Sequence, residues 1–138
     1  MNAGAQYGLL LAIVFIAAGA LGSLGTALFF LLMAAQLAVG AVIVWRRTGL
    51  PWATLGDVVG AVGALAAATL FARGIPLVSL SAESIVFFIA ALTGPLLLAV
   101  EAHVHRQQWQ RWRAWMSEMS AIDVLLGRHI PDLRRDSA

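Results

Sequence analysis

The stretch ALFFLLMAAQLAVGAVIVW, residues 27–45, decides the fold of this chain. It carries no charge along its whole length, and Arg46 and Arg47 follow it at once. A helix rises about 1.5 Å per residue, so a run of this length crosses the roughly 30 Å hydrocarbon core of a bilayer. The apolar residues are continuous and do not alternate with polar ones, as they would in a membrane-spanning strand. The stretch therefore predicts a transmembrane helix.

Three more apolar runs of similar length flank this stretch, at residues 7–24, 52–72 and 84–102. In the chain of 138 residues, 61% are hydrophobic and 12% are charged, whereas a soluble domain usually carries about 25% charged residues. A cleaved signal peptide is not expected, because residues 1–6 lack the basic residues that precede its apolar core. We expect an all-α integral membrane bundle of four transmembrane helices within residues 1–102.

The arginines that flank the runs are unevenly divided between the two sides of such a bundle. One side has only Arg73, whereas the other has Arg46, Arg47, Arg106, Arg111 and Arg113. Basic residues accumulate in the cytoplasmic flanks of membrane proteins. We expect a multi-pass protein of the cell membrane (plasma or inner membrane) whose N- and C-termini are both cytoplasmic.

A C-terminal amphipathic helix is expected at the membrane interface over residues 103–127, followed by a polar tail at 128–138. Its apolar residues recur at steps of three or four, which is one face of a helix: Trp109, Trp112, Met116, Met119, Ile122 and Leu126. Such a helix can lie on lipid or bind a protein partner. The contact residues would be Trp109, Trp112, Arg106, Arg113 and Met116. Nucleic acid is not expected as a partner, because acidic residues return at Glu118 and Asp123.

Two acidic residues lie inside the predicted spans, near their cytoplasmic ends. An acid at the centre of a bilayer costs about 2.5–3.5 kcal/mol on insertion scales. Asp57 is therefore a candidate proton or cation site, although it can also reach interfacial water or pair with an arginine of the preceding loop. Glu101 lies at the same level and can join Asp57 as a two-carboxylate site that shares a proton. Alternatively, Glu101 is a solvated residue one turn before His105.

Small residues form a stripe along the third run. Gly56, Gly60, Ala64 and Ala68 recur at steps of four, with Gly63 beside them. A stripe of this kind lets two helix backbones approach closely. We expect the third helix to pack centrally in the bundle or against another protein.

Two further residues interrupt the apolar runs. Gln36 lies in the middle of the second run, where a buried amide usually hydrogen-bonds to another helix. Pro95 lies in the middle of the fourth run, where it removes one backbone hydrogen bond and predicts a kink. Both features fit a plain structural role, and both fit the wall of a transporter cavity.

The sequence contains no motif that would indicate catalysis or metal binding. The chain has no Cys, and His103 and His105 are two residues apart, so a helix directs their rings to different sides. There is no phosphate-binding loop and no metal-ligand spacing. We expect no metal, no cofactor and no enzymatic activity.

Two hypotheses for the function follow from these patterns. The first is a non-catalytic accessory subunit, or an assembly or stabilising factor, of a larger membrane protein complex; it accounts for the short loops, the small-residue stripe and the Trp-rich tail. The alternative is a small oligomeric channel or transporter that uses Asp57 as its ion or proton site. The expected partners are the lipid bilayer and either a larger membrane protein or further copies of this chain.

Overall fold

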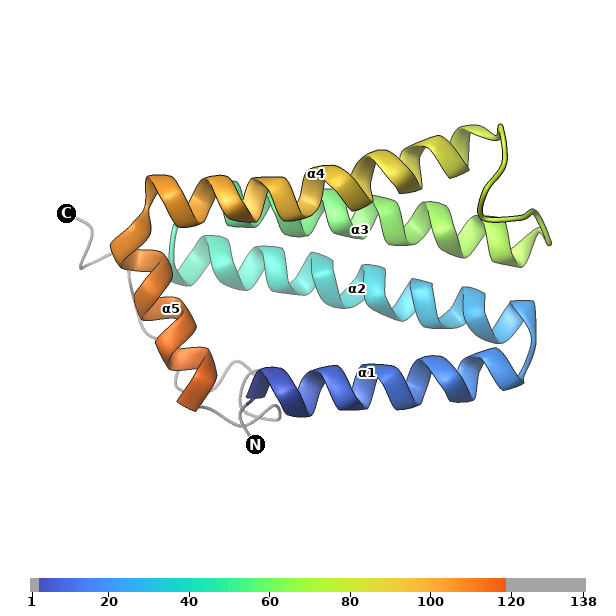
Figure 1. Cartoon of the computed structure of the whole chain (residues 1–138), viewed down its shortest axis with the longest axis horizontal. Coiled ribbons are helices and arrows are strands. Elements are labelled where there is room, and N and C mark those ends of the chain that lie inside the picture. Colours follow the sequence, from blue (N-terminus) through green and yellow to red (C-terminus); the bar gives the residue numbers. More distant parts are fainter. Residues whose placement is uncertain (1–2, 119–138) are drawn as a thin grey trace.

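The computed structural model describes residues 3–118, and every regular element in that range is a helix (Figure 1). The helices are α1 (Ala3–Ala20), α2 (Ser23–Arg47), α3 (Pro51–Ala72), α4 (Ala82–Val104) and α5 (Arg106–Glu118). By length and composition, α2, α3 and α4 can each cross a membrane, and α1 is a shorter apolar helix. The predicted end of the C-terminal helix and the polar tail lie outside the described residues.

The first turn lies earlier in the chain than the sequence predicted. We expected the first helix to end near residue 24, but α1 ends at Ala20 and α2 begins at Ser23. Gly22 adopts a φ of 88°, which is accessible to glycine and strained for most other residues, so the helix breaks there. Gly25 then belongs to α2, where a side chain would meet the carbonyl oxygen of Ala18. The absence of a side chain at Gly25 therefore allows the two helices to approach at this turn.

The second turn ends α2 with several local hydrogen bonds. Gly49 adopts a φ of 65° and donates its N–H to the carbonyl of Val44 at 3.2 Å. The buried Thr48 hydroxyl donates to the same carbonyl at 2.6 Å. Pro51 then occupies the first turn of α3, where its missing N–H leaves no helical bond unmade.

The third connection, residues 73–81, is held by polar contacts at the opposite end of the bundle. Arg73 forms an exposed ion pair with Glu83 at 2.9 Å. Ser81 caps α4, since its hydroxyl accepts a hydrogen bond from the N–H of Ser84 at 3.2 Å. The buried Ser84 hydroxyl donates to the carbonyl of Leu77 at 2.6 Å, which fastens the loop to the start of α4.

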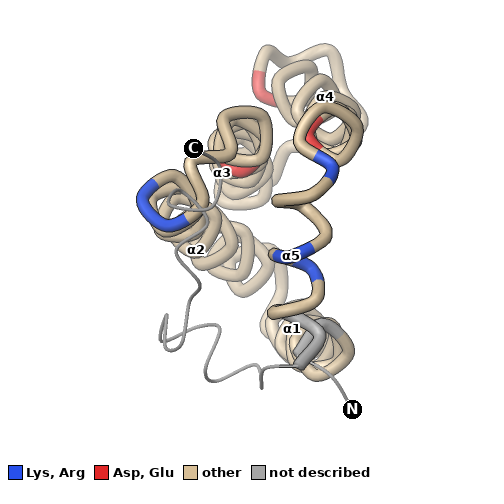
Figure 2. The backbone as a smooth tube through the Cα atoms, turned by 90° about the vertical axis from the view of Figure 1, so that its left-hand side faces the viewer, with Lys and Arg blue, Asp and Glu red and all other residues tan. Residues whose placement is uncertain are grey.

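Helix α3 occupies the centre of the bundle. It packs along α2 on one side and α4 on the other, whereas α1 contacts α2 less extensively. Viewed end-on, α1 to α4 form an open C, and α5 crosses one end from α4 to α1 (Figure 2). The C arrangement leaves α1 and α4 apart along their lengths.

The phenylalanines tie the helices together in the half of the bundle away from α5. All six belong to one network of ring contacts: Phe15, Phe29, Phe30, Phe71, Phe87 and Phe88. The ring of Phe30 is central, because it stacks on Phe71 with centroids 5.6 Å apart and meets Phe87 edge-on at 6.3 Å. The network therefore links α1, α2, α3 and α4.

Candidate functional site

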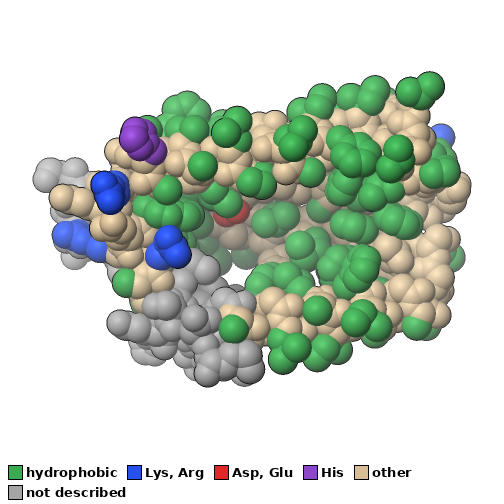
Figure 3. Space-filling view, viewed as in Figure 1, with side chains coloured by type: hydrophobic (Ala, Val, Ile, Leu, Met, Phe, Trp, Pro, Cys, Tyr) green, Lys and Arg blue, Asp and Glu red, His purple; other side chains and the backbone are tan. Residues whose placement is uncertain are grey.

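A cavity of about 330 Å³ lies between α2, α3 and α4. The space-filling view shows it as a hollow that exposes an acidic side chain among apolar ones (Figure 3). Its lining residues are Phe30, Met33 and Leu37 of α2, Gly56, Asp57, Gly60, Gly63 and Ala64 of α3, and Phe87, Ala90, Ala91, Gly94, Pro95 and Leu98 of α4. The cavity therefore combines space for a small ligand with one charged side chain.

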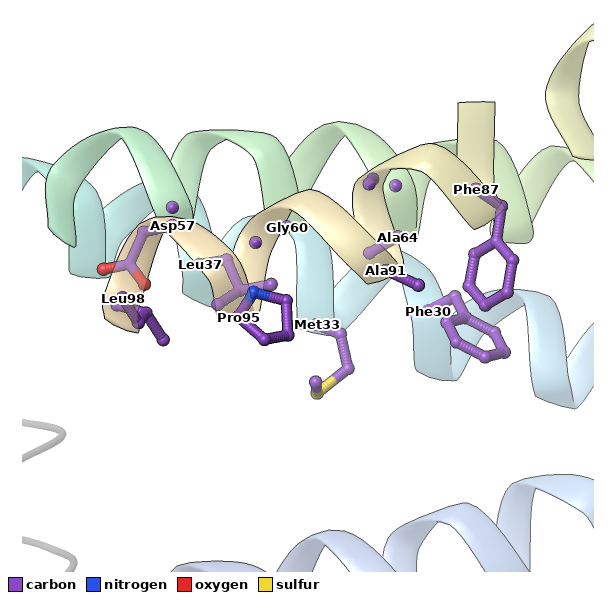
Figure 4. Close-up of a pocket in the computed structure, with 14 residues that line it drawn as sticks. Phe30, Met33, Leu37, Asp57, Gly60, Ala64, Phe87, Ala91, Pro95 and Leu98 are labelled. Carbon is purple, nitrogen blue, oxygen red and sulfur yellow. The ribbon is translucent and has the colours of Figure 1, made fainter. Parts of the chain in front are cut away.

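Asp57 is the one charged residue that lines this cavity. It lies at the end nearest α5, beside Leu98, while Phe30 and Phe87 lie at the other end (Figure 4). Across from it, a side chain at Gly40 of α2 would come within 3.6 Å of its Oδ2 atom. No described residue gives Asp57 a hydrogen bond or an ion pair, and the two described salt bridges involve other acids. The carboxylate therefore faces the cavity without a partner among the described residues.

The small residues of α3 shape the cavity and bring its walls together. A side chain at Gly56 would lie 3.3 Å from the carbonyl oxygen of Gly94 on α4, and one at Gly63 would lie 2.6 Å from the Cβ atom of Ala90. Gly60 faces α2 instead, where a side chain would lie 3.2 Å from Leu37. The stripe thus serves contacts within this chain, on both sides of α3. Ala64 lines the cavity, and Ala68 is buried nearer the opposite end.

Pro95 forms part of the cavity wall on α4 (Figure 4). Its ring nitrogen carries no hydrogen, so the carbonyl of Ala91, one turn earlier, loses its helical donor. Ala91 also lines the cavity. The proline that the sequence predicts to kink this helix therefore lies in the wall of the cavity.

Glu101 has a different environment from Asp57. Its side chain is fully buried, and its Oε2 atom accepts a hydrogen bond from the backbone N–H of Ala53 at 2.8 Å. Its Oε1 atom pairs with Nδ1 of His105, one turn later on the chain. Among the described residues, no hydrogen bond or ion pair joins Glu101 to Asp57, so the two carboxylates are not held together as a pair.

The role of Glu101 in this position is to cap α3. Leu50 is the N-cap residue and has no side-chain acceptor, so the first N–H groups of α3 lack a local partner. A carboxylate from α4 supplies one, and its negative charge is favourable at a helix N-terminus. His105 lies at the corner between α4 and α5, where its backbone N–H donates to the backbone carbonyl of Glu101 at 2.9 Å. Glu101 therefore fixes both the start of α3 and this corner.

The tryptophans of α5 pack onto the end of the bundle. Trp112 is 8% exposed and belongs to a buried cluster with Val44, Leu50 and Ala53. Trp109 and Trp115 pack against the same cluster, and the rings of Trp112 and Trp115 stack with centroids 5.0 Å apart. Arg106 and Arg113 of the same helix are exposed, and the side chain of Met116 lies outside the described residues. The aromatic face predicted to meet lipid or a partner is thus covered in large part by this chain.

The remaining polar candidates from the sequence do not gather into a site. His103 is exposed on α4, and no group of three potential metal ligands occurs among the described residues. Gln36 lines a smaller cavity of about 170 Å³ between α1 and α2, together with Tyr7. Among the described residues, Gln36 has no hydrogen-bond partner on another helix.

Several cavity residues carry no signal in the sequence. Phe30, Phe87, Met33 and Leu98 are ordinary members of apolar runs, and only the packing of the helices turns them toward one space. Gly94 does carry a signal, because it directly precedes Pro95 in the sequence; the structure places it against Gly56 of α3.

Comparison with known proteins adds no relative: no protein-family model, no curated protein and no solved structure matches this chain.

Proposed function

We propose that this chain is a small integral membrane protein that carries a proton or another cation across the bilayer, with Asp57 as the binding group. In this proposal α1 joins α2, α3 and α4 as a fourth span, and both termini lie in the cytoplasm. Helix α5 lies at the cytoplasmic interface with Arg106 and Arg113 toward lipid headgroups. The chain works as an oligomer, because four short helices enclose only a laterally open cavity.

The observation that supports this proposal is the unpartnered carboxylate of Asp57 in an apolar cavity. An acid within a span costs up to about 3 kcal/mol, and such residues usually pair with another group or serve an ion pathway. Glu101, at a similar level, has two partners and a structural role. Asp57 has neither among the described residues, and Pro95 lies in the wall of its cavity. We therefore infer that a transported cation is the partner of the Asp57 carboxylate.

Ion flux in vesicles tests the proposal. The purified protein is placed in liposomes, a membrane potential is imposed, and a trapped pH-sensitive dye reports proton movement. We expect Asp57→Asn to reduce the flux to the level of protein-free vesicles while the protein stays folded. The matched control is Glu83→Gln, which removes a carboxylate at the opposite end and should leave the flux unchanged. Equal flux through wild type and Asp57→Asn would contradict the proposal.

A second candidate is a non-catalytic accessory subunit or assembly factor of a larger membrane complex. The loose attachment of α1 favours it: Leu9, Ile13 and Ile16 are 53%, 56% and 71% exposed. A helix of a larger protein that entered the open side of the C would cover both α1 and α4. Native mass spectrometry in mild detergent separates the candidates, because a stoichiometric larger partner supports the accessory role and a homo-oligomer without a partner supports the transporter.

A further inference from the structure

We propose that the central cavity binds an amphiphilic organic monocation, with its charged end against Asp57 and its apolar body directed toward Phe30 and Phe87. This inference rests on the proposed function, in which Asp57 binds a cation, and it adds the chemical class of that cation. It follows from three properties of the cavity: its charge, its lining and its access.

The charge of the cavity excludes a hard metal ion as the natural occupant. Calcium takes about six to eight oxygen ligands, and magnesium requires near-octahedral oxygen geometry. The lining provides one carboxylate, and its other side chains are aliphatic, aromatic, thioether or absent. One carboxylate balances one positive charge. The site therefore suits a monovalent cation whose charge is attached to apolar groups, which contact the apolar lining.

The lining favours a ligand with a substantial apolar body. A cavity of about 330 Å³ falls within the range of roughly 300–1,000 Å³ that is typical of small-molecule sites. This volume corresponds to about ten water molecules at roughly 30 Å³ each, far more than a bare ion needs. The rings of Phe30 and Phe87 meet edge-on at the end of the cavity away from Asp57 (Figure 4). An aromatic or branched apolar group fills that end and displaces water from it.

The access route also fits an amphiphilic ligand. At the end near Asp57, Leu98 lines the cavity and also packs against the buried cluster of Val44, Leu50 and Trp112. Leu98 therefore separates this end of the cavity from the cluster under α5. The cavity is open on its side, where the space-filling view shows a hollow facing the gap between α1 and α4 (Figure 3). A ligand therefore enters laterally, from the apolar phase between α1 and α4, and an amphiphilic cation partitions into that phase.

Three ions of matched design test the inference on the full-length protein in lipid nanodiscs. Tetraphenylphosphonium has a single positive charge and a large aromatic body. Tetraphenylborate has the same shape and the opposite charge, and tetramethylammonium has the charge without the body. Binding is measured by equilibrium dialysis against empty nanodiscs, with wild type, Asp57→Asn and the control Glu83→Gln.

We expect saturable binding of tetraphenylphosphonium to wild type and to Glu83→Gln, with affinity at least about tenfold weaker for Asp57→Asn. Tetraphenylborate and tetramethylammonium should bind at least about tenfold more weakly than tetraphenylphosphonium. A second variant, Ala91→Leu, keeps Asp57 and fills part of the cavity, so it should also weaken binding; it carries the test if Asp57→Asn does not fold.

Three results would overturn the inference. Equal binding of tetraphenylphosphonium to wild type and Asp57→Asn would mean that the ion only partitions into an apolar surface. Equal binding of tetramethylammonium would mean that the apolar lining contributes nothing. If tetraphenylphosphonium did not bind but the proton flux still depended on Asp57, the organic ligand would be ruled out and the proposed function would be retained.

Discussion

Asp57 and Glu101 are acids near the same end of the bundle, and the difference between them lies in what surrounds each carboxylate. Glu101 is fully buried, yet a backbone N–H and an imidazole satisfy its two oxygens. Asp57 is only partly buried and has no described partner. Burial alone is therefore a poor guide to function here. The carboxylate with satisfied oxygens stabilises the fold, and the one without partners is available to a ligand.

The capping role of Glu101 predicts a specific pattern of stability. Glu101→Ala leaves the N–H of Ala53 buried without an acceptor, a loss worth about 1–3 kcal/mol. Glu101→Gln retains an acceptor oxygen and loses only the charge, so we expect a smaller decrease. Thermal or denaturant unfolding in detergent, followed by circular dichroism, measures both changes.

The control for this stability test is Glu83→Ala, which breaks the exposed ion pair with Arg73. Exposed pairs contribute at most about 1 kcal/mol, so this variant should unfold close to wild type. If Glu101→Ala is as stable as Glu83→Ala, the hydrogen bond to Ala53 does not hold the start of α3.

Among the helices, α3 depends most on residues without side chains. A Cβ atom at Gly63 would lie 2.6 Å from that of Ala90, closer than any normal contact. We expect Gly63→Leu to force α3 and α4 apart and to lower stability by about 1–3 kcal/mol, the usual cost of overpacking. The same substitution at Gly8 of α1 meets nothing within 4 Å, so Gly8→Leu should unfold like wild type in the same assay. Equal stability of the two variants would show that α3 and α4 are not packed closely at this point.

Sequence patterns predicted the helices well and their contacts only in part. Lengths of apolar runs are local properties, so the all-helical architecture and three long apolar helices follow from them. The hydrogen bond from Ala53 to Glu101 joins residues 48 positions apart. It depends on how α4 is rotated against α3, which no local pattern encodes.

The same limit applies to the tail and to the cavity. The spacing of Trp109 and Trp112 predicts an apolar face on a helix, but it does not state whether lipid, a partner or the bundle itself covers that face. The position of Asp57 in an apolar run marked it as a candidate site. The aromatic end of its cavity was not predictable, because Phe30 and Phe87 come from separate helices that meet only in the folded chain.

At the scale of the whole molecule, the two ends of the bundle differ in charge. The end that holds α5 carries Arg46, Arg47, Arg106, Arg111 and Arg113, whereas the opposite connection carries Arg73 paired with Glu83. Because arginine-rich flanks tend to stay in the cytoplasm, we expect this asymmetry to set the orientation of the proposed bundle in a bilayer. In the proposed orientation, the Asp57 end of the cavity would lie nearer the cytoplasm.

The absence of cysteine from the chain makes the orientation directly measurable. Single cysteines are introduced at Ala5 in α1, at the fully exposed Leu80 in the connection between α3 and α4, and at Gln110 in α5. A membrane-impermeant maleimide is then applied to intact cells. We expect it to label Leu80→Cys at once, and to label Ala5→Cys and Gln110→Cys only after permeabilisation.

Each other labelling pattern contradicts a different part of the proposed topology. Immediate labelling of Gln110→Cys with protection of Leu80→Cys would reverse the orientation and place the Asp57 end of the cavity outside the cytoplasm. Immediate labelling of both Ala5→Cys and Leu80→Cys would show that α1 does not span the membrane with the other three helices. In that case α1, which packs less extensively than α2, α3 and α4, would lie on the outer side. The opening between α1 and α4 would then no longer be a lateral entrance from the bilayer. The labelling experiment therefore tests the lipid-side access on which the ligand class depends, independently of any binding assay.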